Sequence, residues 1–196
     1  MSVLINPPAK SPWYLRPALW LAGRIAGKDP LPARVLSHYP KGAIASGLFE
    51  AMAAHGPSDL ETRTLKLARV AASVATGCPF CIDMNAANHE GAKVALAEVR
   101  ALLAGQELPQ ASARERAAVR FARALSETPI IVDDDLAGAL RSNFTEREIV
   151  VLATTIAQVN YWARLNQGLG IPAAGFFGGE CAVGGLGGPT GTNQGT

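Results

Sequence analysis

The chain has 196 residues, of which 48% are apolar and 17% are charged, and its formal net charge is +2. This length suffices for one domain with its own hydrophobic core. The small net charge, with no run of Lys or Arg, argues against a nucleic-acid-binding protein. No stretch reaches the roughly 18 uninterrupted apolar residues that a membrane span needs, so we expect no membrane span.

The first 34 residues are expected to form an N-terminal arm. Its apolar segment from Trp13 to Ala26 is interrupted by Arg16 and Arg24, and no small-residue cleavage site follows. A signal peptide is therefore not expected, and the cytoplasm is the default location. Prolines divide the arm into short helices joined by extended links. We expect an amphipathic arm that packs on the body or on a partner subunit, with contact to a membrane surface as the alternative.

Helix-start signals recur through residues 35–174, which we predict to form the helical domain. A capping box, in which Ser or Thr is followed three residues later by Glu, begins at Ser58, Ser112 and Thr145. No segment shows sustained alternation of apolar and polar residues, so essentially no sheet is expected. The fold class is therefore predicted to be all-α. The expected helices span residues 41–55, 59–76, 79–104, 113–127, 133–141 and 146–167.

Residues 175–196 are dominated by glycine and small polar residues. Such a segment buries too little apolar surface to order itself, so a flexible tail is predicted. Cys181 lies in this tail and is expected to have no role.

Cys78 and Cys81 form a CxxC pair at the start of a predicted helix. Gly77 ends the preceding helix and Pro79 favours the first helical position, which places Cys78 near the N-cap. Both sulfurs would then face the positive end of the helix, where the pKa of a thiol falls. The spacing also allows the pair to alternate between dithiol and disulfide. A thiolate can attack a peroxide to give a sulfenic acid that the second thiol resolves.

The cysteine pair is also compatible with roles that involve no redox chemistry. Two buried cysteines can be inert core residues. A zinc site is disfavoured because zinc takes four ligands and only His89 lies nearby in the sequence, so no metal is expected. A thioredoxin fold is also disfavoured, since no βαβ pattern surrounds the motif.

Two segments carry a resemblance to a known family: RTLKLARVAASVATGCPFCIDMNAANHEGAK and REIVVLATTIAQVNYWARLNQGLGIP. They resemble the carboxymuconolactone decarboxylase / AhpD-like alkylhydroperoxidase superfamily, and the likeness covers residues 35–172. The resemblance implies an AhpD-like helical bundle with a six-helix core. It also implies a homo-oligomer, commonly a trimer or hexamer, with no metal and no bound cofactor.

In the AhpD branch the motif is Cys-x-x-Cys-x-x-x-His, with a glutamate twelve residues before the first cysteine. The resemblance implies that Cys81 is the nucleophile that forms the sulfenic acid. Cys78 would be the more exposed partner, which supplies a proton and closes the disulfide. This chain departs from the motif, because Lys66 stands at the glutamate position and Asn85 at the histidine position. The carboxylate–imidazole relay of the branch is therefore missing.

Three side chains are candidates for replacing the relay. Lys66 would lower a cysteine pKa electrostatically if it faced the thiols, and otherwise extends to solvent. Asn85 would donate a hydrogen bond to a thiolate, or is a surface amide. His89, two turns after Cys81, is a proton shuttle or a surface histidine. Asp83 is interpreted as a first-turn carboxylate that complements the helix dipole.

Three polar residues, Asn160, Arg164 and Asn166, lie near the end of the last predicted helix. Buried Asn or Arg needs a polar partner, so they either bond between helices or subunits or line a polar substrate site.

The sequence and the resemblance are compatible with three alternative functions. The first is a thiol-dependent hydroperoxidase or disulfide oxidoreductase that a disulfide-reducing partner protein regenerates. The second is a carboxymuconolactone decarboxylase-like enzyme for a small carboxylated lactone, with Arg164 and Lys66 as candidate anchors. The third is a non-catalytic oligomeric redox sensor.

Overall fold

The computed structural model describes residues 4–108 and 110–177. All regular structure in this part of the chain is helical, which confirms the predicted fold class. The elements are η1 (Trp13–Leu15), α1 (Arg16–Ala26), α2 (Leu31–Leu36), α3 (Pro40–Met52), α4 (Thr62–Thr76), α5 (Pro79–Ala86), η2 (Glu90–Ala92), α6 (Leu96–Leu103), α7 (Ala113–Ser126), α8 (Asp134–Asn143) and α9 (Glu146–Gly168). Within the described ranges, no helix combines the length and apolar character that crossing a bilayer requires.

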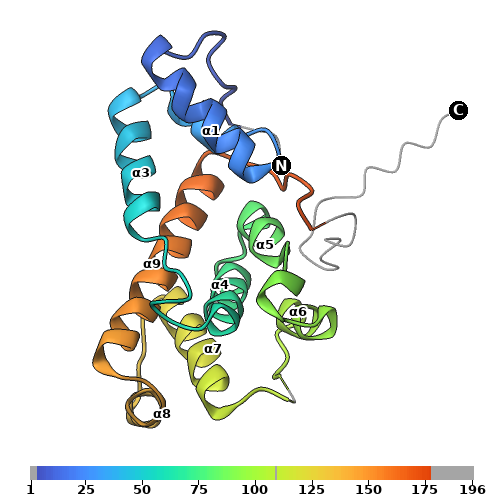
Figure 1. Ribbon diagram of the computed structural model, residues 1–196, viewed down its shortest axis with the longest axis vertical. Helices are drawn as coiled ribbons and strands as arrows, with labels where there is room; N and C mark the ends of the chain where they lie inside the picture. The colour runs from blue at the N-terminus through green and yellow to red at the C-terminus, as the bar shows by residue number, and fades with distance from the viewer. Residues whose placement is uncertain (1–3, 109, 178–196) are drawn as a thin grey trace, which may run out of the picture.

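Helix α4 is the centre of the bundle and packs on α5, α6, α7 and α9 (Figure 1). Leu67, Ala68 and Ala72 on α4 have no exposed surface. Alanine at such positions lets neighbouring helices approach closely. Because α5 follows α4 directly and packs on it, the helix that begins with the CxxC pair is fixed against the centre of the bundle.

The predicted helix starts are confirmed at two of the three capping boxes. Ser112 and Thr145 accept hydrogen bonds from the N–H groups three residues later, which begin α7 and α9. The capping box predicted at Ser58 is wrong, because α4 begins at Thr62 after Glu61, with no side-chain cap. Residues 56–60 form a turn instead, in which the Asp59 carboxylate accepts a hydrogen bond from the Gly56 N–H.

The expected single helix over 79–104 is also wrong. Helix α5 ends at Ala86, and α6 starts only at Leu96. Between them Asn88 and Lys93 have φ angles of 50° and 57°, a left-handed conformation that interrupts a helix. His89 therefore does not lie on the helix that carries Cys81.

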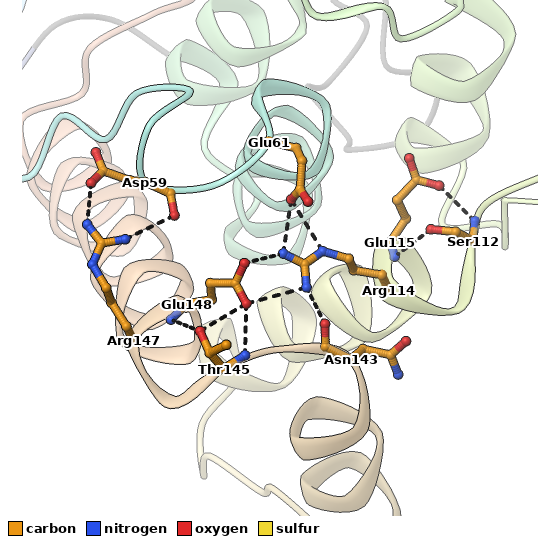
Figure 2. A network of polar contacts seen from close by, with 9 residues as sticks. All are labelled: Asp59, Glu61, Ser112, Arg114, Glu115, Asn143, Thr145, Arg147 and Glu148. Atoms are coloured by element: carbon orange, nitrogen blue, oxygen red, sulfur yellow. Dashed lines mark hydrogen bonds and ion pairs between the residues drawn. The ribbon is translucent and has the colours of Figure 1, made fainter.

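A charged network joins the starts of α4, α7 and α9 (Figure 2). Arg114 Nη2 lies 2.5 Å from Glu148 Oε1 and 3.1 Å from Glu61 Oε2. The hydrogen bond from Arg114 lowers the pKa of Glu148 to about 2. Helix α4 is 15 residues long, so this network lies about 20 Å along the axis from the cysteines.

Both ends of the described chain pack near the start of α5. The Leu4 N–H donates to Leu169 O at 3.1 Å. The predicted flexible tail is wrong for its first residues, because Gly175, Phe176 and Phe177 are held in place. The remainder of the predicted tail, 178–196, with Cys181, lies outside the described residues.

Candidate active site

The CxxC pair has the local geometry that its sequence predicts. Gly77, at φ 65°, ends α4 in the left-handed conformation, and Cys78 is the N-cap of α5. The two Sγ atoms lie 2.7 Å apart, and the Cys81 N–H donates to Cys78 Sγ at 3.3 Å. A disulfide bond of about 2.05 Å is therefore within reach of a small shift of either side chain.

The two thiols differ in pKa because their hydrogen bonds differ. The pKa of Cys78 is lowered by its hydrogen bond with the Cys81 thiol and by the backbone N–H groups of Cys81 and Phe80. The pKa of Cys81 is raised by its hydrogen bond with Cys78 and by its burial. The expectation that both pKa values fall is thus wrong for Cys81. The N-cap position favours the thiolate on Cys78, the reverse of the assignment that the resemblance implies.

Both thiols are covered in this single chain. Cys78 is 0% exposed and Cys81 is 1% exposed, so the implied greater exposure of Cys78 is wrong here. They belong to a small apolar cluster, separate from the main core, which we call the thiol cluster. Its buried members are Val35, Cys78, Phe80, Cys81, Ala163 and Ile171. The cover thus comes from α2, from α9 and from the segment after α9.

The segment after α9 is tied to α5 by one carboxylate. Asp83 is fully buried and accepts three backbone hydrogen bonds, from Ala174 (2.8 Å), Phe176 (3.0 Å) and Phe177 (2.9 Å). We call residues 172–177 the strap. The interpretation of Asp83 as a dipole partner of the helix missed this role. A carboxylate within the apolar run FCIDM was the available signal, because a buried carboxylate needs donors.

The strap closes over the thiol cluster beside a surface depression of about 390 Å³. Phe176 packs edge-on against Phe80, with ring centroids 6.0 Å apart. Lys28, from the N-terminal arm, donates to Ala174 O at 3.0 Å. Phe80 lines the depression and also belongs to the thiol cluster, so its side chain links the two.

Asn85 and Asn166 are the polar side chains closest to the pair. Asn85 Nδ2 donates to Ser73 Oγ at 2.9 Å and to Cys81 O at 3.0 Å. Asn85 therefore bonds to the backbone of α5 and to Ser73 on α4. The expected hydrogen bond from Asn85 to a thiolate is not formed. Asn166 Nδ2, from α9, lies 3.8 Å from Cys81 Sγ.

Lys66 and His89 do not join the site. Lys66 Nζ donates to Ala87 O, at the far end of α5 from the cysteines, and burial lowers the pKa of Lys66 to about 8. His89 Nδ1 is bonded to Val94 O at 2.7 Å and its ring packs against Phe177. The expected relay roles of Lys66 and His89 are therefore wrong in this arrangement. Arg164 is exposed on α9.

Over residues 4–108 and 110–177, no group of three or more His, Cys, Asp or Glu side chains is arranged to hold a metal ion.

The sequence profile of the carboxymuconolactone decarboxylase family matches residues 43–124, which span α4, α5 and most of α7. The uncharacterized protein YnjA of Escherichia coli (strain K12) is 30% identical over 173 residues, covering 87% of this chain and 94% of YnjA. The chain belongs to the carboxymuconolactone decarboxylase family.

Solved structures share the fold of this chain. ATU0492 of Agrobacterium tumefaciens, a protein of unknown function suggested to be an antioxidant defence protein AhpD, is 25% identical with a TM-score of 0.64. That similarity covers 70% of this chain and 94% of ATU0492. A variant of the debrominase Bmp8 in complex with 2,3,4-tribromopyrrole is 22% identical with a TM-score of 0.72, covering 87% of this chain and 91% of the debrominase. The family match stops short of α2 and the strap, so the residues that cover the thiols lie outside it.

Proposed function

We propose that the protein is a dithiol oxidoreductase that reduces a small, mainly apolar hydroperoxide with Cys78 and Cys81. The observation that carries the proposal is the pair of free thiols 2.7 Å apart at the N-terminus of α5, with the N-cap sulfur favoured as thiolate. The apolar residues of the thiol cluster suit an organic hydroperoxide better than a charged substrate.

In the first step, the Cys78 thiolate attacks the terminal oxygen of the hydroperoxide and the O–O bond breaks. The products are a sulfenic acid on Cys78 and an alkoxide, which takes a proton and leaves as the alcohol. In the second step, the Cys81 sulfur attacks the Cys78 sulfur and expels hydroxide, which leaves as water once protonated. The pair is oxidised by two electrons to the disulfide, and the peroxide is reduced by two electrons.

In the proposed mechanism Cys81 is the general acid that protonates the alkoxide. With Cys78 as the thiolate, the proton that the pair retains is on Cys81, whose sulfur lies 2.7 Å from that of Cys78 and therefore close to the alkoxide that forms in the first step. Transfer of this proton leaves Cys81 as the thiolate that the second step requires. One thiol thus replaces the missing carboxylate–imidazole relay, whose positions hold Lys66 and Asn85.

Turnover needs two further events. A dithiol reductant, such as a disulfide-reducing protein partner, returns the disulfide to two thiols and is itself oxidised. The cover over the thiols moves to admit the substrate, and the strap is a short covering element held by the Asp83 carboxylate and by Lys28.

A related reaction is supported by the debrominase neighbour. Reductive removal of one bromine as bromide requires two electrons, which a thiol pair supplies when it is oxidised to a disulfide, so 2,3,4-tribromopyrrole is a second substrate to test. The decarboxylase alternative has less support, because Lys66 is bound at the end of α5 and Arg164 is exposed on α9.

We also propose that the protein acts as a homo-oligomer in the cytoplasm. Large apolar side chains are strongly exposed on α1 and α3, among them Trp20 (65%), Leu48 (59%) and Met52 (84%). Exposed patches of this kind mark interaction surfaces. Sedimentation at several concentrations tests the assembly.

The function is tested with cumene hydroperoxide, a dithiol reductant, and the Cys78→Ser and Cys81→Ser variants. The wild-type protein is expected to consume peroxide and form the 78–81 disulfide. Cys78→Ser is expected to be inactive. Cys81→Ser is expected to complete one oxidation and leave a sulfenic acid on Cys78 that dimedone traps. A sulfenic acid trapped on Cys81 in the Cys78→Ser variant would restore the roles that the resemblance implies. Disulfide formation without turnover would favour a redox sensor.

A further inference from the structure

Asn166 is a buried amide beside the thiol pair with half of its hydrogen-bonding capacity unused. Its side chain projects from the last turns of α9 and is 1% exposed. Nδ2 lies 3.8 Å from Cys81 Sγ, while Oδ1 meets no hydrogen-bond donor among the described residues. Leaving a buried amide oxygen unpaired destabilises the fold, so such atoms are rare and often belong to a functional site.

Two other polar side chains of α9, the buried Gln158 and the half-buried Asn160, have hydrogen-bond partners. Gln158 binds both Arg69 and Glu50, at 2.8 Å each. Asn160 donates to Ser126 Oγ and to Ile156 O, at 2.9 Å each. These two side chains therefore serve as bonds between and within helices. Among the described residues, Asn166 Oδ1 is the buried side-chain polar atom that has no such structural role.

The position of the unpaired oxygen coincides with the proposed chemistry. The Asn166 amide touches Cys81, whose sulfur lies 2.7 Å from that of Cys78. Turning the amide over would let the oxygen accept from the Cys81 thiol and would leave the nitrogen unpaired instead. Either orientation keeps one free amide atom beside the pair.

We propose that Asn166 positions the hydroxyl group that passes from the hydroperoxide to Cys78. This inference rests on the proposed peroxidase function. Oδ1 accepts the hydrogen bond of the terminal O–H of the hydroperoxide, and the same O–H becomes the hydroxyl of the sulfenic acid. Nδ2 donates to the Cys81 sulfur, which becomes a thiolate when it has given up its proton.

One amide thus holds both partners of the second step, the hydroxyl that leaves Cys78 and the sulfur that attacks. Asn166 makes no bond to carbon, sulfur or oxygen in the reaction. It is a positioning residue, and its effect is confined to substrates that carry an O–H.

The test compares Asn166→Leu with the wild-type protein, because leucine keeps the volume of the side chain and removes both polar atoms. Two rates are measured on each reduced protein: oxidation of Cys78 by cumene hydroperoxide, and alkylation of Cys78 by iodoacetamide. Both reagents must pass the same cover and meet the same sulfur, but only the hydroperoxide carries an O–H. Asn160→Leu is the matched control on α9, since it also removes a hydrogen-bonded amide and does not touch the thiols.

Asn166→Leu is expected to slow oxidation about tenfold, the effect of one neutral hydrogen bond of about 1.4 kcal/mol, with alkylation nearly unchanged. Its melting temperature should not fall. Equal slowing of both rates in Asn166→Leu would show a structural role and overturn the proposal, and so would two unchanged rates. A wild-type protein that alkylates but consumes no hydroperoxide would refute the proposed function first.

Discussion

Replacing Asp83 with asparagine tests the tie between the strap and α5. The carboxylate accepts three backbone N–H groups of the strap, two at Oδ2 and one at Oδ1. Asparagine has one acceptor oxygen, and its NH₂ group would face at least one of those N–H donors. A hydrogen bond to a charged acceptor contributes about 1.5–3 kcal/mol, so we expect the strap to lose about 2 kcal/mol of its closing free energy. That loss corresponds to about thirtyfold more open strap.

The assay is alkylation of Cys78 by iodoacetamide under native conditions, with the modified residue identified by mass spectrometry. If the thiols react only from the open state, and opening and closing are fast, the rate follows the open population. Asp83→Asn is therefore expected to react about thirtyfold faster than the wild-type protein. Amide exchange at Phe176 and Phe177 should accelerate by a similar factor.

Glu148→Gln serves as the control because it removes a hydrogen-bonded carboxylate at the opposite end of α4 (Figure 2). It should lower the stability of the bundle and leave native-state alkylation unchanged. An unchanged alkylation rate in Asp83→Asn, together with faster exchange of the strap amides, would show that the strap is not the route to the thiols. Access would then depend on another part of the cover, such as α2, whose Val35 belongs to the thiol cluster.

Three further outcomes are expected from the titrating groups. Burial lowers the pKa of Lys66 to about 8, so the unfolded state binds more protons between pH 8 and about 10.5. Stability should rise with pH in that window, and Lys66→Met should remove the rise in urea unfolding while leaving thiol oxidation unchanged. The pKa of Glu148 is lowered to about 2 by Arg114, so its contribution is present above about pH 4.5 and is lost as pH falls toward 2. The advantage of the wild-type protein over Glu148→Gln in urea unfolding should therefore shrink across that range. Cys81→Ala removes the largest cause of the lowered pKa of Cys78, so the midpoint of Cys78 alkylation against pH should move upward.

Features set by neighbouring residues were predictable from the sequence. The capping boxes at Ser112 and Thr145, and the N-cap position of Cys78, involve groups within three or four residues of one another. The break after α5 was missed because it depends on left-handed backbone at Asn88 and Lys93, which does not disturb the pattern of apolar residues.

Features that join distant residues were not predictable. Asp83 meets the strap some 91–94 positions later, and Asn166 meets Cys81 across 85 positions. The sequence showed that a polar side chain in an apolar helix needs a hydrogen-bond partner, but it did not identify the partner residue. The same limit applies to Lys66, whose motif position placed it near the thiols while its side chain reaches the other end of α5.

The exchange of roles between the two cysteines follows from the loss of the relay. A base close to Cys81 would draw its proton and place the negative charge there. In this chain the relay positions hold Lys66 and Asn85, and both are occupied with backbone oxygens of α5 or its end. The N–H donors of the first turn stabilise a thiolate on Cys78, whereas Cys81 has only the longer contact with Asn166 Nδ2 at 3.8 Å. In the proposed mechanism the charge is therefore on the N-cap sulfur and the proton on Cys81, so that the pair supplies both the nucleophile and the acid.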